Sequence, residues 1–483
     1  MHFFLKAIIV ITIMQILIFL FLHKKAKLEY LFVIQAIMIG YVYNLIFPAF
    51  TISDEMTHFM SGYHISNMIM GIQDERINER SDGFAIYNLH IRDIDEELFQ
   101  FPSSFDVNRL GIKNYQRHKI FQKSDLMLIH AEAVGTDYQP FPMYVLMGIS
   151  ITISRILNLS PFMLVWLTRM VNLVIYSLIG MLIIKIIPFG KLMLYTILAM
   201  PMGLINAASA SYHTLLFSIT IFFVAYILRI KEVGKISRRD ITVILIMLLI
   251  IPPIKGCFLF YILLLTLLPK ELFSSVQKWK AFLCISIITG ICTWFFYNAY
   301  IVDIEKLLSN SHGSRIITYM DAGEGIYLID ILQNPLHYLK LLIRTIVLRG
   351  FYMDRSMIQM QTDFGSFAYL LIIGLFFYNS FFNEDSYYFQ NAIKDKAILL
   401  ATYFFTYALM SFIAFFQWGS RQWQIIELKG SYTYQFLPLI GFAIKGNIHP
   451  DIMRRNQIAL TYFILITAHF AGILNLLFVA GAV

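Results

Sequence analysis

Long apolar stretches dominate the chain, and charged residues gather between them. A helix that crosses a bilayer needs about 20 consecutive, mostly apolar residues. Stretches near that length occur along the whole sequence, so the pattern predicts an all-α fold, a polytopic transmembrane helical bundle of about twelve spans. The predicted spans, of which 240–253 and 256–269 are short, are residues 3–22, 30–50, 161–186, 192–208, 212–229, 240–253, 256–269, 281–300, 365–382, 397–417, 432–446 and 457–480.

Two other apolar segments, residues 142–157 and 335–349, are too short or too charged to count as spans. In the second, Lys340, Arg344 and Arg349 recur at helical spacing beside a face of leucine and isoleucine. A helix of this kind lies in the plane of the lipid headgroups with its apolar face in the membrane. We therefore predict an interfacial helix at each segment.

Lysine and arginine concentrate in four short loops, which sets the expected orientation. By the parity of the predicted spans, all four fall on one side of the membrane: residues 23–28, 229–239, 270–280 and 445–455. Short basic loops stay in the cytoplasm. Both termini and the two long polar segments, 51–160 and 301–364, are therefore predicted to lie outside, the first as a large extracytoplasmic loop.

Composition supports a membrane protein and narrows the function classes. Hydrophobic residues make up 58% of the 483 residues and charged residues only 14%, which lies outside the usual range of soluble domains. An aromatic share of 16% suits helices that end in interfacial rings, so we expect no nucleic-acid partner. Cys257, Cys284 and Cys292 form no CxxC pair, and neither a zinc site nor a disulfide framework is predicted.

The stretch "FPAFTISDEMTHFM", residues 47–60, places Asp54, Glu55 and His58 directly after an apolar span. A helix that starts near Ser53 puts Asp54 and His58 on one face, four residues apart. Acidic residues also cap ordinary surface helices, which is the structural alternative. Because charges next to the bilayer are costly to desolvate, we predict a catalytic site. A carboxylate would act as general base on an acceptor hydroxyl, with His58 orienting it or sharing a cation.

Two further stretches offer cations for an anionic ligand. In "IIPPIKGCF", Lys255 follows two prolines that break a helix and could present the ammonium inward, although an interfacial anchor is an equal alternative. In "FFQWGSRQWQIIELKGSYTYQFLPLIGF", Arg421, Glu427, Lys429 and Tyr434 lie among aromatic residues outside the membrane. An aromatic belt explains much of this stretch, and the functional interpretation is a site for phosphate or a sugar ring.

Several motifs occur in the order found in one bacterial multi-spanning family, the domain of unknown function 2142. The run "SDEMTHFMSGYHISNMIMG" resembles its Asp-Glu-x-x-His-Phe signature, and "YQPFPMYVLMGISI" resembles its loop helix with a Tyr-x-Pro start. Further along, "RMVNLVIY" resembles its Arg-x-x-Asn span, and "AMPMGLINAASASYHT" its Ser-x-Ser-Tyr-Asp segment. The collinear matches run from about residue 30 to about residue 445, and Lys255 falls where the family tends to carry a lysine.

That family looks like a branch of the C-class (GT-C) membrane glycosyltransferases, which use a polyprenyl-phosphate sugar donor. Such enzymes place an acidic catalytic residue in the first large extracytoplasmic loop. The resemblance therefore implies a GT-C-like architecture and Asp54 as the base, with Glu55 and His58 beside it. It also implies a location in the bacterial cytoplasmic membrane, with the active site facing outside.

Other site residues follow from this resemblance and from the two cationic stretches described above. The substrate-binding candidates are Tyr138, Tyr212 and His213, and the candidates for donor phosphate and lipid are Lys255, Arg421, Lys429 and Tyr434. Two positions depart from the family pattern. His213 stands where the family has aspartate, and Thr433, Tyr434 and Gln435 replace its Gly-Arg-Tyr, so the expected arginine is missing.

The resulting prediction is an inverting glycosyltransferase whose partners are a polyprenyl-phosphate sugar donor, a glycan or cell-wall acceptor, and membrane lipid. No cofactor and no metal site are predicted, and a requirement for a divalent cation stays open. A transporter or flippase of lipid-linked saccharides is the rival class, and a polysaccharide polymerase or ligase is a third candidate. Neither a Walker-type nor a GxGxxG nucleotide motif occurs in a strand-helix context.

Four units are expected along the chain. Residues 1–29 hold an extra N-terminal transmembrane helix and a basic cytoplasmic loop, and residues 30–300 hold the GT-C-like module with its loop 51–160. Residues 301–364 form a second extracytoplasmic segment with an interfacial helix, and residues 365–483 hold the C-terminal transmembrane helices.

Overall fold

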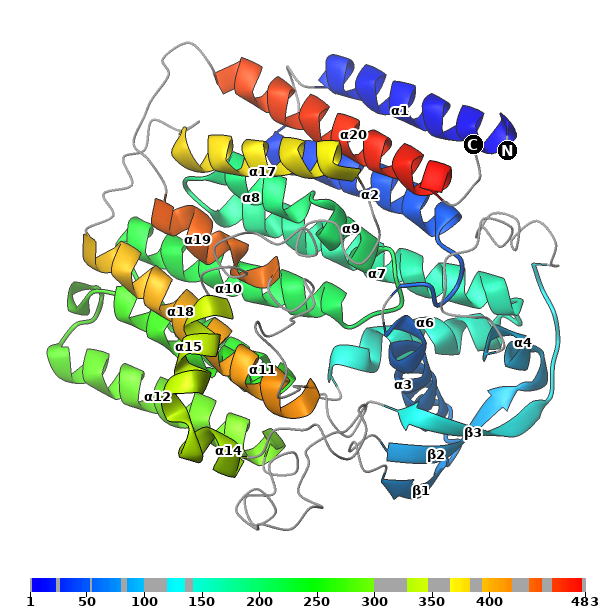
Figure 1. Ribbon diagram of the computed structural model, residues 1–483, viewed down its shortest axis with the longest axis horizontal. Helices are drawn as coiled ribbons and strands as arrows, with labels where there is room; N and C mark the ends of the chain where they lie inside the picture. Colours follow the sequence, from blue (N-terminus) through cyan, green and yellow to red (C-terminus); the bar gives the residue numbers. More distant parts are fainter. Residues whose placement is uncertain are drawn as a thin grey trace.

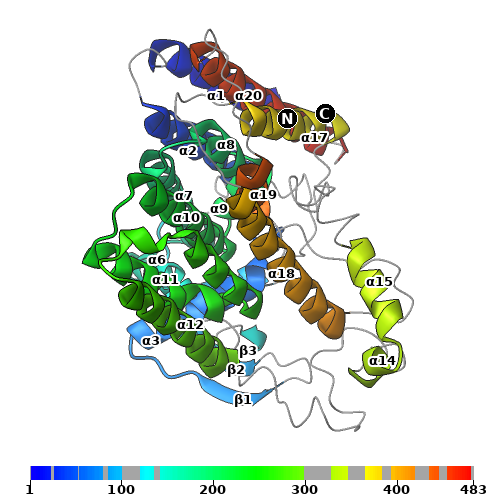
Figure 2. The same ribbon diagram turned by 90° about the vertical axis from the view of Figure 1, so that its left-hand side faces the viewer.

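A bundle of helices forms the body of the molecule in the computed structural model (Figures 1 and 2). The structure describes residues 2–22, 27–52, 54–79, 85–99, 120–134, 142–298, 328–345, 365–382, 393–418, 434–444 and 454–479. The bundle consists of α1 (His2–Leu22), α2 (Leu28–Ile46), α7 (Pro161–Ile186), α8 (Lys191–Leu198), α9 (Pro201–Ala207), α10 (His213–Val233), α11 (Arg238–Ile254), α12 (Val276–Asn298), α17 (Gly365–Phe381), α18 (Ile393–Trp418), α19 (Leu437–Ile444) and α20 (Arg454–Val479), with the 3-10 helices η4 (Gly256–Leu267), η5 (Lys270–Leu272) and η8 (Tyr434–Phe436).

Each predicted span overlaps at least one of these helices, so the fold is mostly helical as expected. Within the described part of the chain, five helices are long and apolar enough to cross a membrane. They are Leu28–Ile46, Pro161–Ile186, His213–Val233, Val276–Phe295 and Asn456–Leu477. These spans support a multi-pass membrane protein, whereas the count of twelve stays a prediction.

The predicted span 192–208 is divided into α8 and α9 by a break inside the bundle. Pro201 begins α9 and Met200 before it is extended (φ −63°, ψ 151°), because proline lacks an N–H and disfavours a helical residue ahead of it. A side chain from the far end of the sequence satisfies one carbonyl at the break. Nε2 of His469 donates to the carbonyl of Ala199 at 2.7 Å, so α20 is tied to the centre of the bundle.

The predicted span 256–269 is short for an α-helix, and most of it forms the 3-10 helix η4. Its 12 residues extend about 24 Å at the 3-10 rise of about 2.0 Å per residue, against about 18 Å at the α-helical rise. Phe258, Tyr261, Leu264 and Leu267 are buried at a spacing of three, which is the period of this helix. The tighter winding therefore lets a short segment reach further across the bundle.

The prediction of an all-α fold is wrong between α2 and α6 (Pro142–Ile156), where a three-stranded antiparallel sheet forms. Its order is β1 (Glu75–Glu79), β2 (Ala85–Arg92) and β3 (Leu126–Val134). Tyr87, Leu89 and Ile91 are buried and alternate with less buried residues, as expected for a strand with one covered face. The strands are short and carry charged residues, so they are not visible in the pattern of long apolar stretches.

The sheet belongs to a unit that we call the sheet subdomain, which also contains α3 (Glu55–Ile69), η1 (Asp93–Asp95), α4 (Glu96–Phe99) and α6 (Pro142–Ile156). Helix α3 packs against both β3 and α6. Its contact with α6 is close, since a Cβ on Gly148 would lie 2.4 Å from the Ile65 side chain. Figure 1 places this subdomain at the same end of the bundle as the first turn of α1 and the last turn of α20, which agrees with the predicted topology.

The two predicted interfacial helices are present as helices. The first is α6, and the second is α15 (Pro335–Thr345), which follows α14 (Leu328–Gln333). Leu336, Leu339 and Ile343 are exposed along one side of α15, as expected for a helix at a membrane surface. Residues 346–349 of the predicted segment lie outside the described residues, and the position of either helix relative to lipid stays a prediction.

Gly203 in α9 allows two tyrosine hydroxyls to meet in the core. A Cβ there would lie 2.4 Å from the hydroxyl oxygens of both Tyr176 and Tyr434, which are 3.2 Å apart. Gly203→Ala is therefore expected to lower the free energy of unfolding by about 1 to 3 kcal/mol through overpacking, measured by thermal unfolding in detergent. Gly374→Ala, whose Cβ would meet nothing within 4 Å, is the matched control, and equal melting temperatures for the two variants would contradict the prediction.

Candidate functional site

Asp54 and Glu55 stand at the start of α3, and their environments differ. The helix begins at Glu55, two residues after Ser53, near which its start was predicted, and Asp54 precedes it as an exposed residue with φ 62°. This left-handed conformation is uncommon for a residue other than glycine, although aspartate tolerates it better than most. The amide of His58 donates to the carbonyl of Asp54 at 3.1 Å, so the backbone of this turn is fixed.

Glu55 is fully buried and forms a bidentate ion pair with Arg169 of α7. Nε and Nη2 of Arg169 donate to the two carboxylate oxygens at 2.8 and 2.7 Å, and neither side chain is exposed. The backbone amides of Phe50 and Ala210 donate to the same carboxylate at 3.0 and 2.8 Å. The carboxylate thus accepts four hydrogen bonds, which satisfies its capacity as an acceptor.

The guanidinium of Arg169 also holds the segment that leads into α3. Nη1 donates to the carbonyl of Phe47 at 2.7 Å, and Nη2 donates to that of Pro48 at 2.8 Å. One turn further along α7, Asn172 donates to the carbonyl of Ser209 at 2.8 Å. The motif "RMVN" therefore fixes the two segments that meet at Glu55. Sequence reasoning gave Arg169 no role, although an arginine inside an apolar span was a visible signal.

A cluster of four buried rings lies beside the first turn of α3. Nδ1 of His58 is 3.1 Å from the hydroxyl of Tyr144 on α6, and the His58 ring meets Tyr212 edge-on with centroids 4.6 Å apart. Tyr212 and His213 stack with centroids 4.5 Å apart. All four side chains are buried. The structure thus brings together three predicted site residues from distant motifs and adds Tyr144 to them.

Tyr144 lies within electrostatic reach of Asp54. Burial raises the pKa of Tyr144, and the nearby Asp54 carboxylate raises it further. A phenol that keeps its proton is a hydrogen-bond donor. We therefore group the ring cluster with the exposed carboxylate as one candidate site, which we call the α3 site and define as Asp54, His58, Tyr144, Tyr212 and His213.

Tyr434, predicted to bind the donor phosphate, lies in the protein core. Its hydroxyl donates to the carbonyl of Ile197 at the end of α8 and lies 3.2 Å from the hydroxyl of Tyr176. Its ring centroid is 4.6 Å from that of Phe217, which is 5.6 Å from that of His213. Tyr434 therefore packs behind the ring cluster through Phe217, and its contact with the donor phosphate stays a prediction.

Lys255 lies at the break between α11 and η4, as the two prolines before it predict. Pro252 and Pro253 belong to the last turn of α11, and Lys255 follows in extended conformation (φ −149°, ψ 125°) with a partly buried side chain. The helix after it is tied to η8, because the hydroxyl of Tyr261 donates to the carbonyl of Gln435 at 3.2 Å. The position keeps Lys255 as a candidate ligand for an anion.

The other predicted site residues, Tyr138, Arg421 and Lys429, lie outside the described residues. Within the described ranges, no group of three or more His, Cys, Asp or Glu side chains is arranged to hold a metal ion. The choice of cation for the donor phosphate therefore stays a prediction, and so does any dependence on a divalent metal.

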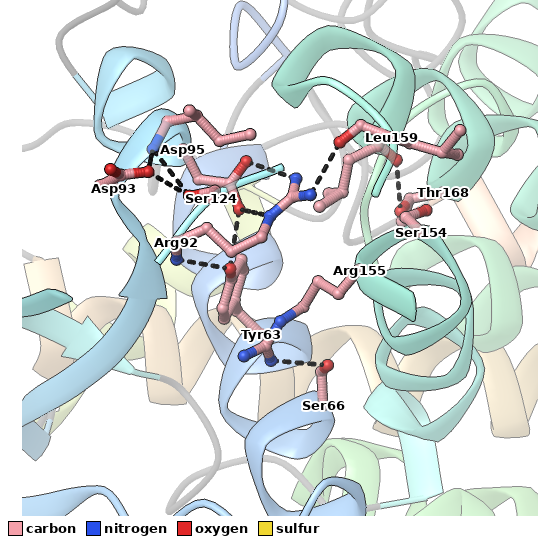
Figure 3. Close-up of polar contacts among 12 residues, drawn as sticks. Tyr63, Ser66, Arg92, Asp93, Asp95, Ser124, Ser154, Arg155, Leu159 and Thr168 are labelled. Carbon is pink, nitrogen blue, oxygen red and sulfur yellow. Dashed lines mark hydrogen bonds and ion pairs between the residues drawn. The ribbon is translucent and has the colours of Figure 1, made fainter. Parts of the chain in front are cut away.

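A second buried ion pair fastens the sheet to the helices around it (Figure 3). Nε and Nη2 of Arg92 donate to Asp95 at 2.7 Å each, and its Nη1 donates to the carbonyl of Leu159 at 2.8 Å. Tyr63 of α3 donates to the same aspartate at 2.7 Å. Arg155 of α6 lies over the Tyr63 ring, 4.7 Å from its centroid. These contacts join the sheet to α3 and to the start of α7.

Asp74 joins α3 to β2 through a buried carboxylate. It lies 2.7 Å from Nδ1 of His64 and accepts from the side chain of Asn67 at 2.8 Å and from the backbone amide of His90 at 2.9 Å. Burial raises the pKa of Asp74, but these hydrogen bonds outweigh it and leave the pKa below its ordinary value. The ionised carboxylate is therefore the form that the fold stabilises.

Acid is expected to loosen the sheet from α3 through Asp74. A carboxyl group whose pKa is lower in the folded state stabilises the fold above its unfolded pKa, about 3.9, and loses that contribution as pH falls through the folded pKa. Between about pH 5 and pH 2, amide exchange in β2, corrected for intrinsic rates, should accelerate in the wild type and much less in Asp74→Asn. The control is Asp125→Asn, at an exposed carboxylate. An equal acid response in Asp74→Asn and the wild type would contradict the prediction.

One known protein family matches most of the chain. The family described as a predicted membrane protein, DUF2142, matches residues 37–444, more than four fifths of the chain. No curated protein matches the chain, and no solved structure matches it. Helices α1 and α20 lie outside the matched range. The chain therefore belongs to the DUF2142 family of predicted membrane proteins.

Proposed function

We propose that this protein is an integral-membrane glycosyltransferase. It would transfer a sugar from a polyprenyl-phosphate-linked donor to a cell-surface glycan or cell-wall polymer outside the bacterial cytoplasmic membrane. The observation that carries the proposal is the first turn of α3, where the exposed Asp54 adjoins the buried and fully bonded Glu55. An ion pair that fixes the turn holds Asp54 in a defined place near His58 and Tyr144.

In the proposed reaction, Asp54 is the general base. It takes the proton of the acceptor hydroxyl while the acceptor oxygen forms a bond to the anomeric carbon of the donor sugar. The bond from the anomeric carbon to the phosphate oxygen breaks, and polyprenyl phosphate leaves with the electron pair. Attack from the side opposite the leaving group inverts the anomeric configuration. A positioned base typically contributes about 100- to 10,000-fold to such a rate.

Glu55 was predicted to stand beside the base, and we assign it a positioning role together with Arg169. A base must have an oxygen free to accept a proton, whereas the Glu55 carboxylate already accepts four hydrogen bonds and has no exposed surface. His58 and Tyr144 remain as polar groups next to Asp54, and we propose that they orient the acceptor. Tyr212 and His213 are proposed to line the sugar subsite.

Lys255 is our first candidate for the group that meets the donor phosphate, with Arg421 and Lys429 as alternatives. Negative charge grows on the leaving phosphate as its bond to the sugar breaks. A fixed cation at that point stabilises the transition state more than the ground state. The helix break at Lys255 supports this choice, because it removes the side chain from a continuous helical surface.

The test is sugar transfer by purified protein in liposomes supplied with radiolabelled polyprenyl-phosphate sugars and cell-wall glycan. We expect label to pass to the glycan, with an inverted linkage by nuclear magnetic resonance, and a parallel sample with a chelator reports on divalent metal. Movement of labelled donor across the bilayer without transfer would favour a flippase. No transfer from any of the donors would contradict the proposal.

A further inference from the structure

Four large apolar side chains stand exposed where the sheet subdomain meets the start of α7. We call them the apolar rim: Ile120, Phe121, Ile156 and Leu157, which are 56, 63, 65 and 52% exposed. Two backbone hydrogen bonds hold the two segments of the rim together. The amide of Gln122 donates to the carbonyl of Asn158 at 2.7 Å, and the amide of Ser160 donates to that of Ile120 at 2.9 Å. The two segments that form the rim are therefore held in a fixed arrangement.

The apolar rim continues onto helices that carry further exposed apolar residues. On α6, Ile149 and Ile153 are 42 and 45% exposed, at helical spacing from Ile156. The candidate span α7 packs against α6 and exposes three residues at the same kind of spacing, Val174, Leu178 and Leu182. On a spanning helix such a stripe faces lipid. The exposed residues of α7 begin about 20 Å along the helix from its start, so they mark its lipid-facing side, and Ile149 and Ile153 of α6 carry the apolar surface next to the rim.

The length of α7 gives the depth of the rim. Its 26 residues extend about 39 Å at about 1.5 Å per residue, and a typical tilt of about 20° reduces this to about 37 Å along the membrane normal. The hydrocarbon core is about 30 Å thick, and the bilayer with headgroups is about 40 to 45 Å thick. With Lys185 in the last turn of α7 at the inner boundary, the start of α7 and the adjoining rim reach the outer headgroup layer.

We propose that the apolar rim inserts into the outer leaflet and seats the sheet subdomain on the membrane, with phospholipid as its partner. Single exposed apolar side chains are common on protein surfaces, but four on two hydrogen-bonded segments, followed by Ile149 and Ile153 on α6, mark an interaction site. The opposite side of α6 carries Tyr144, and α6 is closely packed on α3 through Gly148. Seating α6 therefore sets the depth of Asp54 relative to the lipid headgroups. The inference stands whether or not the protein transfers sugars.

The test uses spin labels on single cysteines in lipid nanodiscs, after the three native cysteines are replaced by alanine. Labels are placed at Phe121→Cys and Ile156→Cys, with Ile77→Cys as control, because Ile77 is 44% exposed on the edge strand β1, away from α7. Labels in the rim should collide more with oxygen, which dissolves in lipid, than with a water-soluble nickel complex. The control should show the reverse. Rim labels that behave like the control, or that collide with neither oxygen nor the nickel complex, would overturn the proposal.

A second measurement needs no substitution and covers the case in which a cysteine variant fails to fold. Hydroxyl radicals generated in water oxidise exposed side chains, and phenylalanine reacts faster than isoleucine when both are equally accessible. In wild-type protein in nanodiscs, Phe121 is expected to be oxidised more slowly than Ile77. Faster oxidation of Phe121 than of Ile77 would show that the rim lies in water and would overturn the proposal.

Discussion

Asn in place of Asp54 is expected to lower the rate of sugar transfer by about 100- to 10,000-fold while the protein stays folded. An amide cannot take the proton of the acceptor hydroxyl. The substitution keeps the size of the side chain, and asparagine tolerates the left-handed backbone of this position, where φ is 62°. Because Asp54 is exposed, stability should change by no more than about 0.5 kcal/mol. The initial rate of label transfer and the melting temperature are measured on the same preparation.

Asp125→Asn is the matched control for this experiment, because it removes an exposed carboxylate from the same subdomain. It should transfer sugar at the wild-type rate. If Asp54→Asn also transfers at that rate, Asp54 is not the base. If wild-type protein transfers and Asp54→Asn unfolds at a lower temperature, the loss of rate would reflect structure and not chemistry.

Removal of Arg169 is expected to destabilise the fold and not only to slow a reaction. Arg169→Leu leaves the buried carboxylate of Glu55 without its cation, and breaking one partner of a buried ion pair costs about 3 to 5 kcal/mol. The carbonyls of Phe47 and Pro48 also lose their donors. Since domains are stable by only about 5 to 15 kcal/mol, the melting temperature should fall steeply, as measured by thermal unfolding in detergent.

The double variant Arg169→Leu with Glu55→Leu distinguishes the effect of an unpaired buried charge from the effect of losing the anchor of the turn. Both buried charges are gone, so part of the lost stability should return. Activity should not return with it, because the turn that holds Asp54 has lost its anchor. Arg238→Leu, which removes an exposed arginine, serves as the control. A single Arg169→Leu variant that melts like the wild type would show that the ion pair is not needed.

The positions of the helices could be predicted from the sequence, because a helix in lipid must be apolar over a length set by the membrane. Pro201 and the pair Pro252 and Pro253 are visible in the sequence as helix breakers, and a break lies at each place. The sheet could not be found in this way. Its strands are short, and their stability comes from pairing partners such as Asn88 and His130, which lie far apart in the sequence.

The candidate site could be predicted only in part. Sequence reasoning placed Asp54, Glu55 and His58 together, but it could not tell which carboxylate is buried, because that is decided by Arg169 from another helix. For the same reason it could not show that Tyr434 is enclosed by elements remote in sequence. Long-range contacts, and not local pattern, assign these roles.

The period of η4 limits how this segment can change in evolution. Each residue of a 3-10 helix turns the chain by about a third of a circle and advances it by about 2.0 Å. Loss of one residue within η4 would rotate Lys255 about 120° relative to the buried residues beyond the deletion, such as Leu264 and Leu267. Loss of three would restore that alignment but bring Lys255 about 6 Å closer to the end of η4. We therefore expect the distance from Lys255 to the end of η4 to be held constant among related chains, whatever apolar residues fill it.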